Sequence, residues 1–245
     1  MATVKVGQIL TNNQKCEYKV IEHKNSRHVR IQFLDEHKHE LVTTDWKAKM
    51  GSIENPFHRS VRGKGYLGVG EFSGKIGSYG RHAYLKWQGV LARCYGEKYD
   101  TGSYADATVC EDWHDFQKFA EWCSSQKNYD MGFDIDKDII NIGNKHYSPE
   151  NCCLVHPEIN RMVIDFSLVD IRKNMGLQYD EKRRKYRAMA SVGGYKKHIG
   201  TFKDFDEAKA AYIELKKQYF KNMVIVHKDN IDMRAAKSLW SWKES

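Results

Sequence analysis

The sequence predicts an α+β protein built from several small domains. Short runs of β-branched and apolar residues fill the first 58 residues, helical periodicity begins at about residue 82, and a second β-rich segment precedes an alanine-rich stretch near residue 208. At 245 residues, the chain is long for one compact domain. We therefore expect an N-terminal β meander or small barrel (1–62), a glycine-rich linker (63–81), a mixed domain with a helical lead-in (82–168), a three-stranded sheet packed on one helix (172–222) and a C-terminal tail (223–245).

Composition excludes several classes of protein. Forty Lys and Arg residues against 32 Asp and Glu residues give a formal net charge of +8. No apolar run approaches the roughly 18 residues that a membrane span requires, and the first residues lack the apolar core of a signal peptide. Aromatic residues make up 12% of the chain, which argues against disorder. We therefore expect a cytoplasmic protein without membrane contacts, whose six cysteines are reduced thiols.

Three apolar runs predict the N-terminal strands. They cover residues 16–21, 28–34 and 39–44, separated by polar turns. Seven glycines then follow up to Gly80 and include a Gly-x-Gly-x-x-Gly pattern at 63–68. A dinucleotide-binding loop needs a hydrophobic strand before this pattern and a helix directly after it. Because the glycines continue instead, we interpret the stretch as a linker, and the N-terminal domain as a surface for DNA or a protein partner.

Apolar residues at helical spacing predict two helices in the middle of the chain. The first begins at about His82, and the second covers residues 114–125 with Asp112 as its N-cap. We expect their aromatic and cysteine side chains to form core rather than to bind a cofactor. The apolar face of the first helix consists of Tyr84, Trp87, Leu91 and Cys94, and that of the second of Phe116, Phe119, Ala120 and Cys123.

The segment from 133 to 160 predicts a strand, a loop, a second strand and a helix. The first strand alternates apolar residues with three carboxylates, which therefore share one face. The second strand is expected over 152–155, and the helix from Pro157, because proline is tolerated in a first helical turn. The three carboxylates are Asp134, Asp136 and Asp138.

This arrangement, with the sequence Tyr-Ser-Pro-Glu-Asn-Cys at 147–152, resembles the ββα-metal core of HNH endonucleases, particularly a phage-encoded class. The lead-in also resembles that class, through Trp87, the Arg-Cys-Tyr sequence at 93–95 and the segment 109–116. The resemblance implies that Asp136 and Asn160 hold one divalent cation, Mg²⁺ or Mn²⁺, through hard oxygen atoms. It also implies that Asn151 braces the loop.

The general base is where the sequence departs from that family. The histidine that serves as base aligns with Lys137, and a lysine with an ordinary pKa near 10.4 is a poor base at neutral pH. His146 in the loop and His156 after the second strand are possible substitutes. The departure leaves open a core that keeps its metal-holding or DNA-docking geometry without cleavage.

The cysteines raise the alternative of a structural zinc site. A zinc site of this kind normally shows paired Cys-x-x-Cys spacing, and none is present. We therefore expect buried thiols rather than zinc. The four cysteines in question are Cys94, Cys110, Cys152 and Cys153.

The positive charge is concentrated near the C-terminus. Residues 172–222 contain 14 Lys and Arg residues and 6 Asp and Glu residues, which accounts for the whole excess. Within them, two alternating segments joined by Gly193-Gly194 predict a hairpin, and Asp204 or Asp206 is a suitable cap for the helix that follows. A folded segment with this charge is typical of a protein that binds the phosphate backbone of nucleic acid.

This module, over about 174–220, resembles the Apetala-type (ethylene-response-factor) DNA-binding domain, which lays one sheet face in the major groove. The resemblance implies that Arg187 reads guanine, while the charged turn 182–185 contacts phosphate. The reading face consists of Gln178, Arg187, Met189, Ser191, Lys196 and His198, and the turn of Lys182, Arg183, Arg184 and Lys185.

Together these observations predict a phage-type HNH endonuclease or nickase, comparable to a homing endonuclease, that binds double-stranded DNA through its C-terminal module. The alternative is a sequence-specific DNA-binding protein on a degenerate nuclease core, acting as a regulator or as an inhibitor of another DNA-processing system. A third, weaker alternative is an adaptor whose N-terminal β domain contacts proteins.

Overall fold

The computed structural model describes residues 3–97, 104–127, 129, 132–167, 176–192 and 195–242, and describes only the backbone at 162, 164–167 and 191–192. The side chain of Ser191 and the Gly193-Gly194 turn therefore lie outside the described residues.

The chain divides into two compact units, one of residues 1–71 with 114–117 and one of residues 72–113 with 118–245. The expected α+β class is confirmed. In the described part of the chain, no helix combines the length and apolarity needed to span a bilayer.

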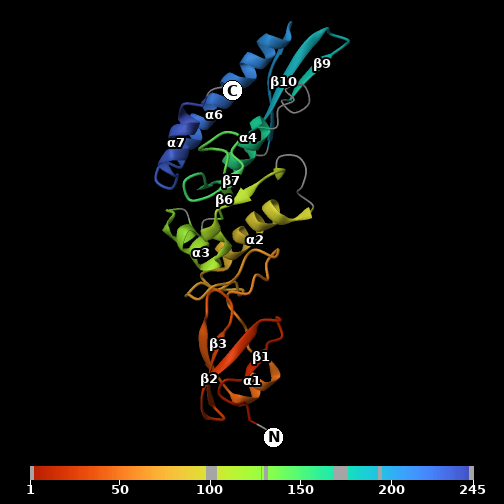
Figure 1. Ribbon diagram of the computed structural model, residues 1–245. Coiled ribbons are helices and arrows are strands. Elements are labelled where there is room, and N and C mark those ends of the chain that lie inside the picture. The colour runs from red at the N-terminus through yellow and green to blue at the C-terminus, as the bar shows by residue number, and fades with distance from the viewer. Residues whose placement is uncertain are drawn as a thin grey trace. The chain divides into compact units, whose positions relative to one another are not determined.

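The sheet of the first unit is an open antiparallel meander (Figure 1). Its strands follow one another in space as in sequence: β1 (Ile9–Thr11), β2 (Glu17–Asn25), β3 (His28–Phe33) and β4 (Glu40–Thr43). The meander was predicted, although β1 was not. The barrel alternative is wrong, because in the described sheet β1 and β4 are the two edges and do not pair with each other.

Alternation along β2 and β3 builds the core of this unit. Tyr18 and Val20 on β2 and Ile31 on β3 are fully buried, while the residues between them reach the surface. The short helix α1 (Asp45–Met50) packs on this layer through Ala48, whose carbonyl oxygen accepts a hydrogen bond from the Tyr18 hydroxyl. The unit is therefore held by one hydrophobic layer between a sheet and a helix.

Two helices open the second unit as the apolar periodicity predicts. Helix α2 (Arg81–Tyr95) buries Trp87, whose indole N–H donates to the carbonyl oxygen of Trp113 at 2.7 Å. The predicted apolar face of α3 (Phe116–Ser125) is fully buried. The predicted cap Asp112 is wrong: it lies in the 3₁₀ helix η3 (Glu111–His114) and pairs with Lys118.

The predicted order of strand, loop, strand and helix is also present. Strand β6 (Asp134–Asp136) pairs antiparallel with β8 (Cys153–Val155), and α4 (Pro157–Ser167) begins at the predicted proline. Within the loop, β7 (His146–Tyr147) pairs in parallel with β5 (Thr108–Val109).

The first of these strands is shorter than predicted. The Asp136 carboxylate accepts backbone N–H bonds from Asp138 at 2.8 Å and Ile139 at 2.7 Å, and the strand ends there. Asp138 therefore does not share a strand face with Asp134 and Asp136, contrary to prediction. Short-range hydrogen bonding by an aspartate overrides the alternation of the sequence.

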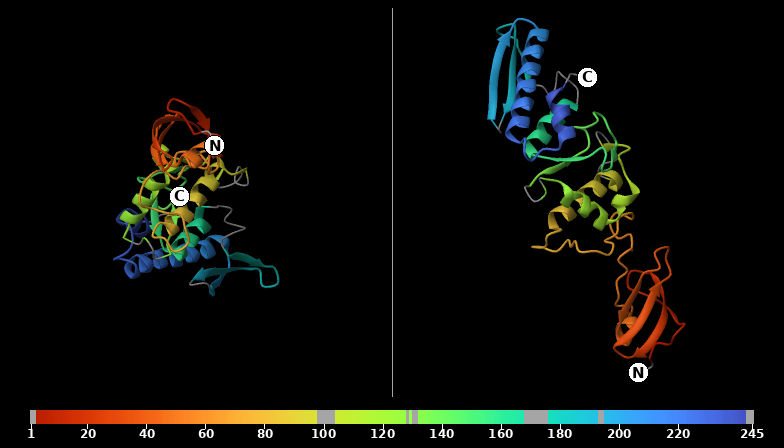
Figure 2. Two further views of the ribbon diagram at one scale, coloured as in Figure 1. Left: turned by 90° about the horizontal axis from the view of Figure 1, so that it is seen from below. Right: turned by 90° about the vertical axis from the view of Figure 1, so that its left-hand side faces the viewer.

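The C-terminal sheet has three antiparallel strands packed on one helix. They are β9 (Leu177–Asp180), β10 (Lys185–Val192) and β11 (Tyr195–Phe202), with β10 in the centre. Helix α6 (Phe205–Val226) lies along one face (Figure 2), and its N-cap is Asp204, whose carboxylate accepts the N–H of Glu207 at 2.8 Å. Leu177, the alanines of β10 and the first half of α6 form the core between them.

Helix α6 extends well beyond this sheet and joins a second core. Phe220 and Met223 in its second half pack with Ile139, Val155 and Ile159 of the strand–loop–strand–helix segment. Helix α7 (Met233–Trp240), which falls in the predicted tail, contributes Ala235, Ala236 and Leu239 to the same cluster. The last described residues are thus part of this hydrophobic core.

Candidate functional site

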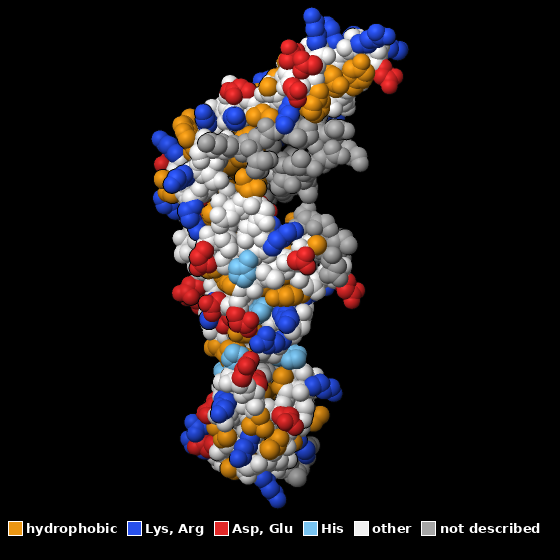
Figure 3. All heavy atoms as spheres, turned by 45° about the horizontal axis from the view of Figure 1, so that its top comes forward, with side chains coloured by type: hydrophobic (Ala, Val, Ile, Leu, Met, Phe, Trp, Pro, Cys, Tyr) orange, Lys and Arg blue, Asp and Glu red, His pale blue; other side chains and the backbone are white. Residues whose placement is uncertain are grey.

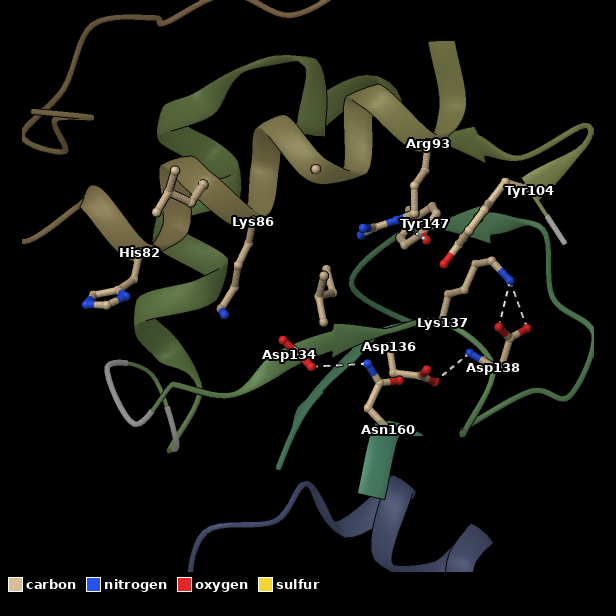
Figure 4. Close-up of a pocket in the computed structure, with 13 residues that line it drawn as sticks. His82, Lys86, Arg93, Tyr104, Asp134, Asp136, Lys137, Asp138, Tyr147 and Asn160 are labelled. Carbon is tan, nitrogen blue, oxygen red and sulfur yellow. Dashed lines mark hydrogen bonds and ion pairs between the residues drawn. The ribbon is translucent and has the colours of Figure 1, made fainter. Parts of the chain in front are cut away.

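A pocket opens in the second unit between helix α2 and strand β6 (Figure 4). Its volume of about 390 Å³ is within the range of small-ligand sites. One side is acidic and comes from β6 and α4, and the other is basic and comes from α2. The lining residues are His82, Leu85, Lys86, Gly89, Arg93, Tyr104, Asp134, Ile135, Asp136, Lys137, Asp138, Tyr147 and Asn160.

The acidic side holds the two residues predicted to bind a metal. Asp136 ends β6, and Asn160 lies in the first turns of α4. The Asn160 amide donates from Nδ2 to Asp134 Oδ2 at 3.4 Å, which leaves its Oδ1 buried and without a hydrogen-bond partner among the described residues. The strand pairing and the start of α4 thus bring Asp134, Asp136 and Asn160 to one wall.

The chemistry of these groups fits a hard divalent cation. Asp136 is only 6% exposed, and burial raises the pKa of its carboxyl group, although two backbone N–H bonds oppose this shift. Its Oδ1 accepts both N–H bonds, no hydrogen bond to its Oδ2 is present among the described residues, and Figure 4 shows this carboxylate next to the Asn160 amide. One or two carboxylate or amide oxygens with water are typical of Mg²⁺. No three His, Cys, Asp or Glu side chains gather as a metal site in the described ranges.

Lys137, which the sequence resemblance places at the position of a general base, donates hydrogen bonds to neighbouring groups. Its ammonium donates to both carboxylate oxygens of Asp138 at 2.8 Å and to the carbonyl oxygen of Asn144 at 2.6 Å. The residue is 5% exposed. Because this nitrogen already donates to three acceptor atoms, its position suits a structural role better than proton abstraction.

The substitute histidines and Asn151 lie outside the pocket lining. His146 Nδ1 lies 2.9 Å from the Thr108 hydroxyl, which joins β7 to β5. His156 stacks on His227 with ring centroids 4.9 Å apart. Asn151 accepts from Asn141 at 2.9 Å and donates to the His146 carbonyl at 3.4 Å, so it connects the two ends of the loop.

The basic side is one face of α2. His82, Lys86 and Arg93 follow one another at spacings of four and seven residues, which places them on the same helix face. Burial lowers the pKa of Lys86, although the neighbouring Asp134 carboxylate opposes this shift. Arg93 donates from Nε to the Tyr147 hydroxyl at 2.8 Å. A pocket with cations on one wall and oxygen ligands on the other is suited to an anion bound together with a metal ion.

The cysteines are thiols that burial keeps protonated. Burial raises the pKa of Cys94 to about 11 and that of Cys152 to about 12. Cys152 and Cys153 are fully buried, and Cys94 and Cys110 are half-buried. Cys153 belongs to the hydrophobic core that includes α7.

Of the six residues predicted to read DNA, the five whose side chains are described are exposed or half-buried. Strand register places Gln178 opposite Arg187, and Met189 opposite His198, on the sheet face away from α6. Lys196 pairs with the backbone of Ser191 in the same register. The four basic residues of the turn 182–185 are exposed, and the top of Figure 3 shows Lys and Arg side chains alongside acidic and hydrophobic ones.

Arg187 is partly engaged within its own sheet. One terminal nitrogen lies 3.7 Å from Asp180 Oδ2, and its Nε is buried without a hydrogen-bond partner in the described part of the chain. Its side chain is 42% exposed. Because this side chain is partly exposed and its ion pair is long, its terminal nitrogens are accessible to another acceptor.

Sequence reasoning missed the basic wall of the pocket. His82, Lys86 and Tyr104 were not singled out, and Arg93 and Tyr147 entered only through the family resemblance. The sequence feature that could have revealed this wall is the helical spacing of the polar residues of α2, away from the buried apolar stripe. That spacing shows a shared face, but it does not show that the face lines a cavity.

Comparison with protein-family models, with curated proteins and with solved structures finds no match for this chain. The two family resemblances drawn from the sequence therefore remain hypotheses.

Proposed function

We propose that this protein is a metal-dependent DNA endonuclease or nickase whose C-terminal sheet binds double-stranded DNA. The observation that carries the proposal is the pocket in which oxygen ligands from Asp136 and Asn160 face the basic side of α2. Phosphodiester hydrolysis needs a cation at the developing charge on the phosphate and a group that takes a proton from water.

Asp136 and Asn160 would hold one Mg²⁺ or Mn²⁺, which supplies charge stabilisation to the phosphate when bound. The orphaned Oδ1 of Asn160 supports this assignment. His82 is the histidine among the described residues that line the pocket, so we assign proton transfer to it in place of Lys137. Asp134 orients the Asn160 amide through its hydrogen bond.

The C-terminal sheet would deliver the DNA. Its outward face combines Gln178, Arg187 and His198, and the turn 182–185 adds four exposed positive charges. Base-edge readout and phosphate contact require these two kinds of group, respectively.

The direct test is nicking of a supercoiled plasmid with Mg²⁺ or Mn²⁺. Asp136→Ala and Asn160→Ala should abolish nicking and lower the affinity for Mn²⁺ measured by electron paramagnetic resonance. Asp229→Ala, which removes an exposed carboxylate from the turn before α7, is the matched control and should retain both. Metal-dependent nicking that persists in both pocket variants would contradict the proposal.

The second candidate is a DNA-binding regulator on an inactive nuclease core. It is favoured by the burial of Lys137 between Asp138 and Asn144, because the family's base position then has no free proton acceptor. Salt-sensitive DNA binding by a wild-type protein that never nicks DNA, with either metal, would favour this candidate.

A further inference from the structure

We propose that Arg93, held by Tyr104 and Tyr147, forms a preorganised site for a phosphodiester group of the DNA backbone. This inference rests on the proposed function and specifies which part of the substrate enters the pocket. The site is distinct from the pair of oxygen ligands provided by Asp136 and Asn160.

Two tyrosines fix the guanidinium of Arg93. Its Nε–H donates to the Tyr147 hydroxyl at 2.8 Å. Its central carbon lies 5.4 Å from the ring centroid of Tyr147 and 5.7 Å from that of Tyr104, within the range of cation–π attraction. Tyr147 is 2% exposed, so this anchor is itself rigid. A long side chain that is already ordered loses less entropy when it binds a ligand.

The terminal nitrogens of Arg93 remain as hydrogen-bond donors. The Nη1 and Nη2 groups have no hydrogen-bond or ion-pair partner among the described residues, although Arg93 is only half-exposed and lines a pocket that contains carboxylates. Four N–H groups arranged as a fork match two oxygens of a phosphate. In Figure 4 the guanidinium points into the pocket, away from the end of α2.

A glycine lies beneath this group. Gly89 lies in the interior of α2, where glycine costs roughly 1 kcal/mol relative to alanine. A Cβ atom at this position would lie 3.4 Å from Arg93 Nη1. The missing side chain keeps the pocket wall open beside the terminal nitrogens, and the same α2 face carries Lys86 one turn earlier.

The charges of the pocket indicate an anion rather than a cation at this end. Asp138 is already paired with Lys137, so it does not neutralise Arg93. The remaining carboxylates, Asp134 and Asp136, belong to the opposite wall (Figure 4). A phosphodiester bound to Arg93 would therefore face the oxygen ligands across the pocket.

The test uses the trinucleotide d(TpTpT), whose only charges are two phosphodiesters. Calorimetric titration would compare the wild type with Arg93→Gln, Arg93→Lys and Tyr147→Phe. Lys237→Gln, on the exposed side of α7, is the matched charge control. Thermal unfolding of each variant identifies any that fail to fold, and Arg93→Lys keeps the charge if Arg93→Gln unfolds.

We expect Arg93→Gln to raise the Kd for d(TpTpT) about 10-fold, because two charge-assisted hydrogen bonds are lost. Arg93→Lys should show a smaller increase, since the fork is lost and the charge remains. Tyr147→Phe should raise the Kd about threefold by freeing the guanidinium, and Lys237→Gln should bind as the wild type does.

Two results would overturn the inference: no saturable binding of d(TpTpT) to the wild type, or equal Kd values for Arg93→Gln and Lys237→Gln. Plasmid nicking measured in parallel distinguishes a failure of this inference from a failure of the proposed function. If the wild type nicks plasmid DNA but the Kd for d(TpTpT) does not change when Arg93 is replaced, only the phosphate site is overturned. An Arg93-dependent Kd without nicking supports the site and overturns the nuclease.

Discussion

The ammonium nitrogen of Lys137 lies 2.8 Å from both carboxylate oxygens of Asp138. The contact lies in the turn that follows β6, where the Asp136 carboxylate accepts the Asp138 N–H. The pair determines which acceptors the Lys137 ammonium contacts. A charge held in this way stabilises a turn and offers no lone pair to a water molecule.

We therefore predict that Lys137 contributes to stability more than to cleavage. Lys137→Met leaves Asp138 without its partner and should lower the free energy of unfolding by about 3 kcal/mol. This value is at the lower end of the range for breaking a buried ion pair, because the Asp138 side chain is 24% exposed. Urea denaturation measures this loss, with the exposed Lys75→Met as control. Loss of nicking in a Lys137→Met protein that is as stable as the wild type would instead make Lys137 part of the chemistry.

The two kinds of basic residue in the C-terminal module should respond differently to mutation. Arg187→Ala should cost about 1–3 kcal/mol of specific binding and relax base preference at one position. Arg184→Ala should weaken binding to all sequences and reduce the salt slope by about one unit. Fluorescence anisotropy against a panel of duplexes at several salt concentrations distinguishes the two effects. Affinity that does not depend on salt would contradict the role of the whole module.

Arg234 should be critical for the loop beside the pocket. Its guanidinium donates to the carbonyl oxygens of Pro149 at 3.1 Å, Glu150 at 2.8 Å and Cys152 at 3.0 Å, and so ties α7 to the loop before β8. Arg234→Ala should lower stability by about 2–3 kcal/mol, because three acceptors lose a charged donor. Arg234→Lys should recover less than half of this loss, since an ammonium cannot reproduce the fork. Chemical denaturation of both variants provides the measurement.

The same contact predicts a loss of stability in acid. Burial disfavours the charged form of Asp232, but hydrogen bonds from the Arg234 side chain and from backbone N–H groups outweigh burial and lower the pKa of its carboxyl group. A carboxyl group whose pKa is lower in the folded state stabilises the protein above its unfolded pKa, near 3.9. That contribution is lost as the pH falls below about 4 and through the folded value. Asp232→Asn should flatten this part of the stability–pH curve, whereas the exposed Asp229→Asn should not.

Helix α7 should contribute to the stability of the fold through its buried side chains. Leu239 is 2% exposed within the cluster that includes Phe220, so Leu239→Ala should cost about 2–5 kcal/mol through the cavity it leaves. Met233 on the same helix is 75% exposed, and Met233→Ala should change stability by less than about 0.5 kcal/mol. Equal, small effects in thermal unfolding would mean that α7 does not stabilise the fold.

The sequence by itself determined the elements whose signals are local. The apolar stripe of α2, the alternation of β2 and β3, Pro157 at the start of α4 and the alanine-rich α6 follow from periodicity and capping within a few residues. Only the family resemblance grouped Asp136 with Asn160 in advance, and in the structure β6 pairs with β8, which is followed directly by α4.

Tertiary structure decided what depends on residues far apart in the chain. No local pattern shows that Arg93 meets Tyr147, 54 positions later, or that Arg234 reaches the loop at 149–152. Whether β1 and β4 close a barrel depends on hydrogen bonds between strand edges. Periodicity records which face of an element is apolar, whereas packing selects the partner of that face and which polar groups line a pocket.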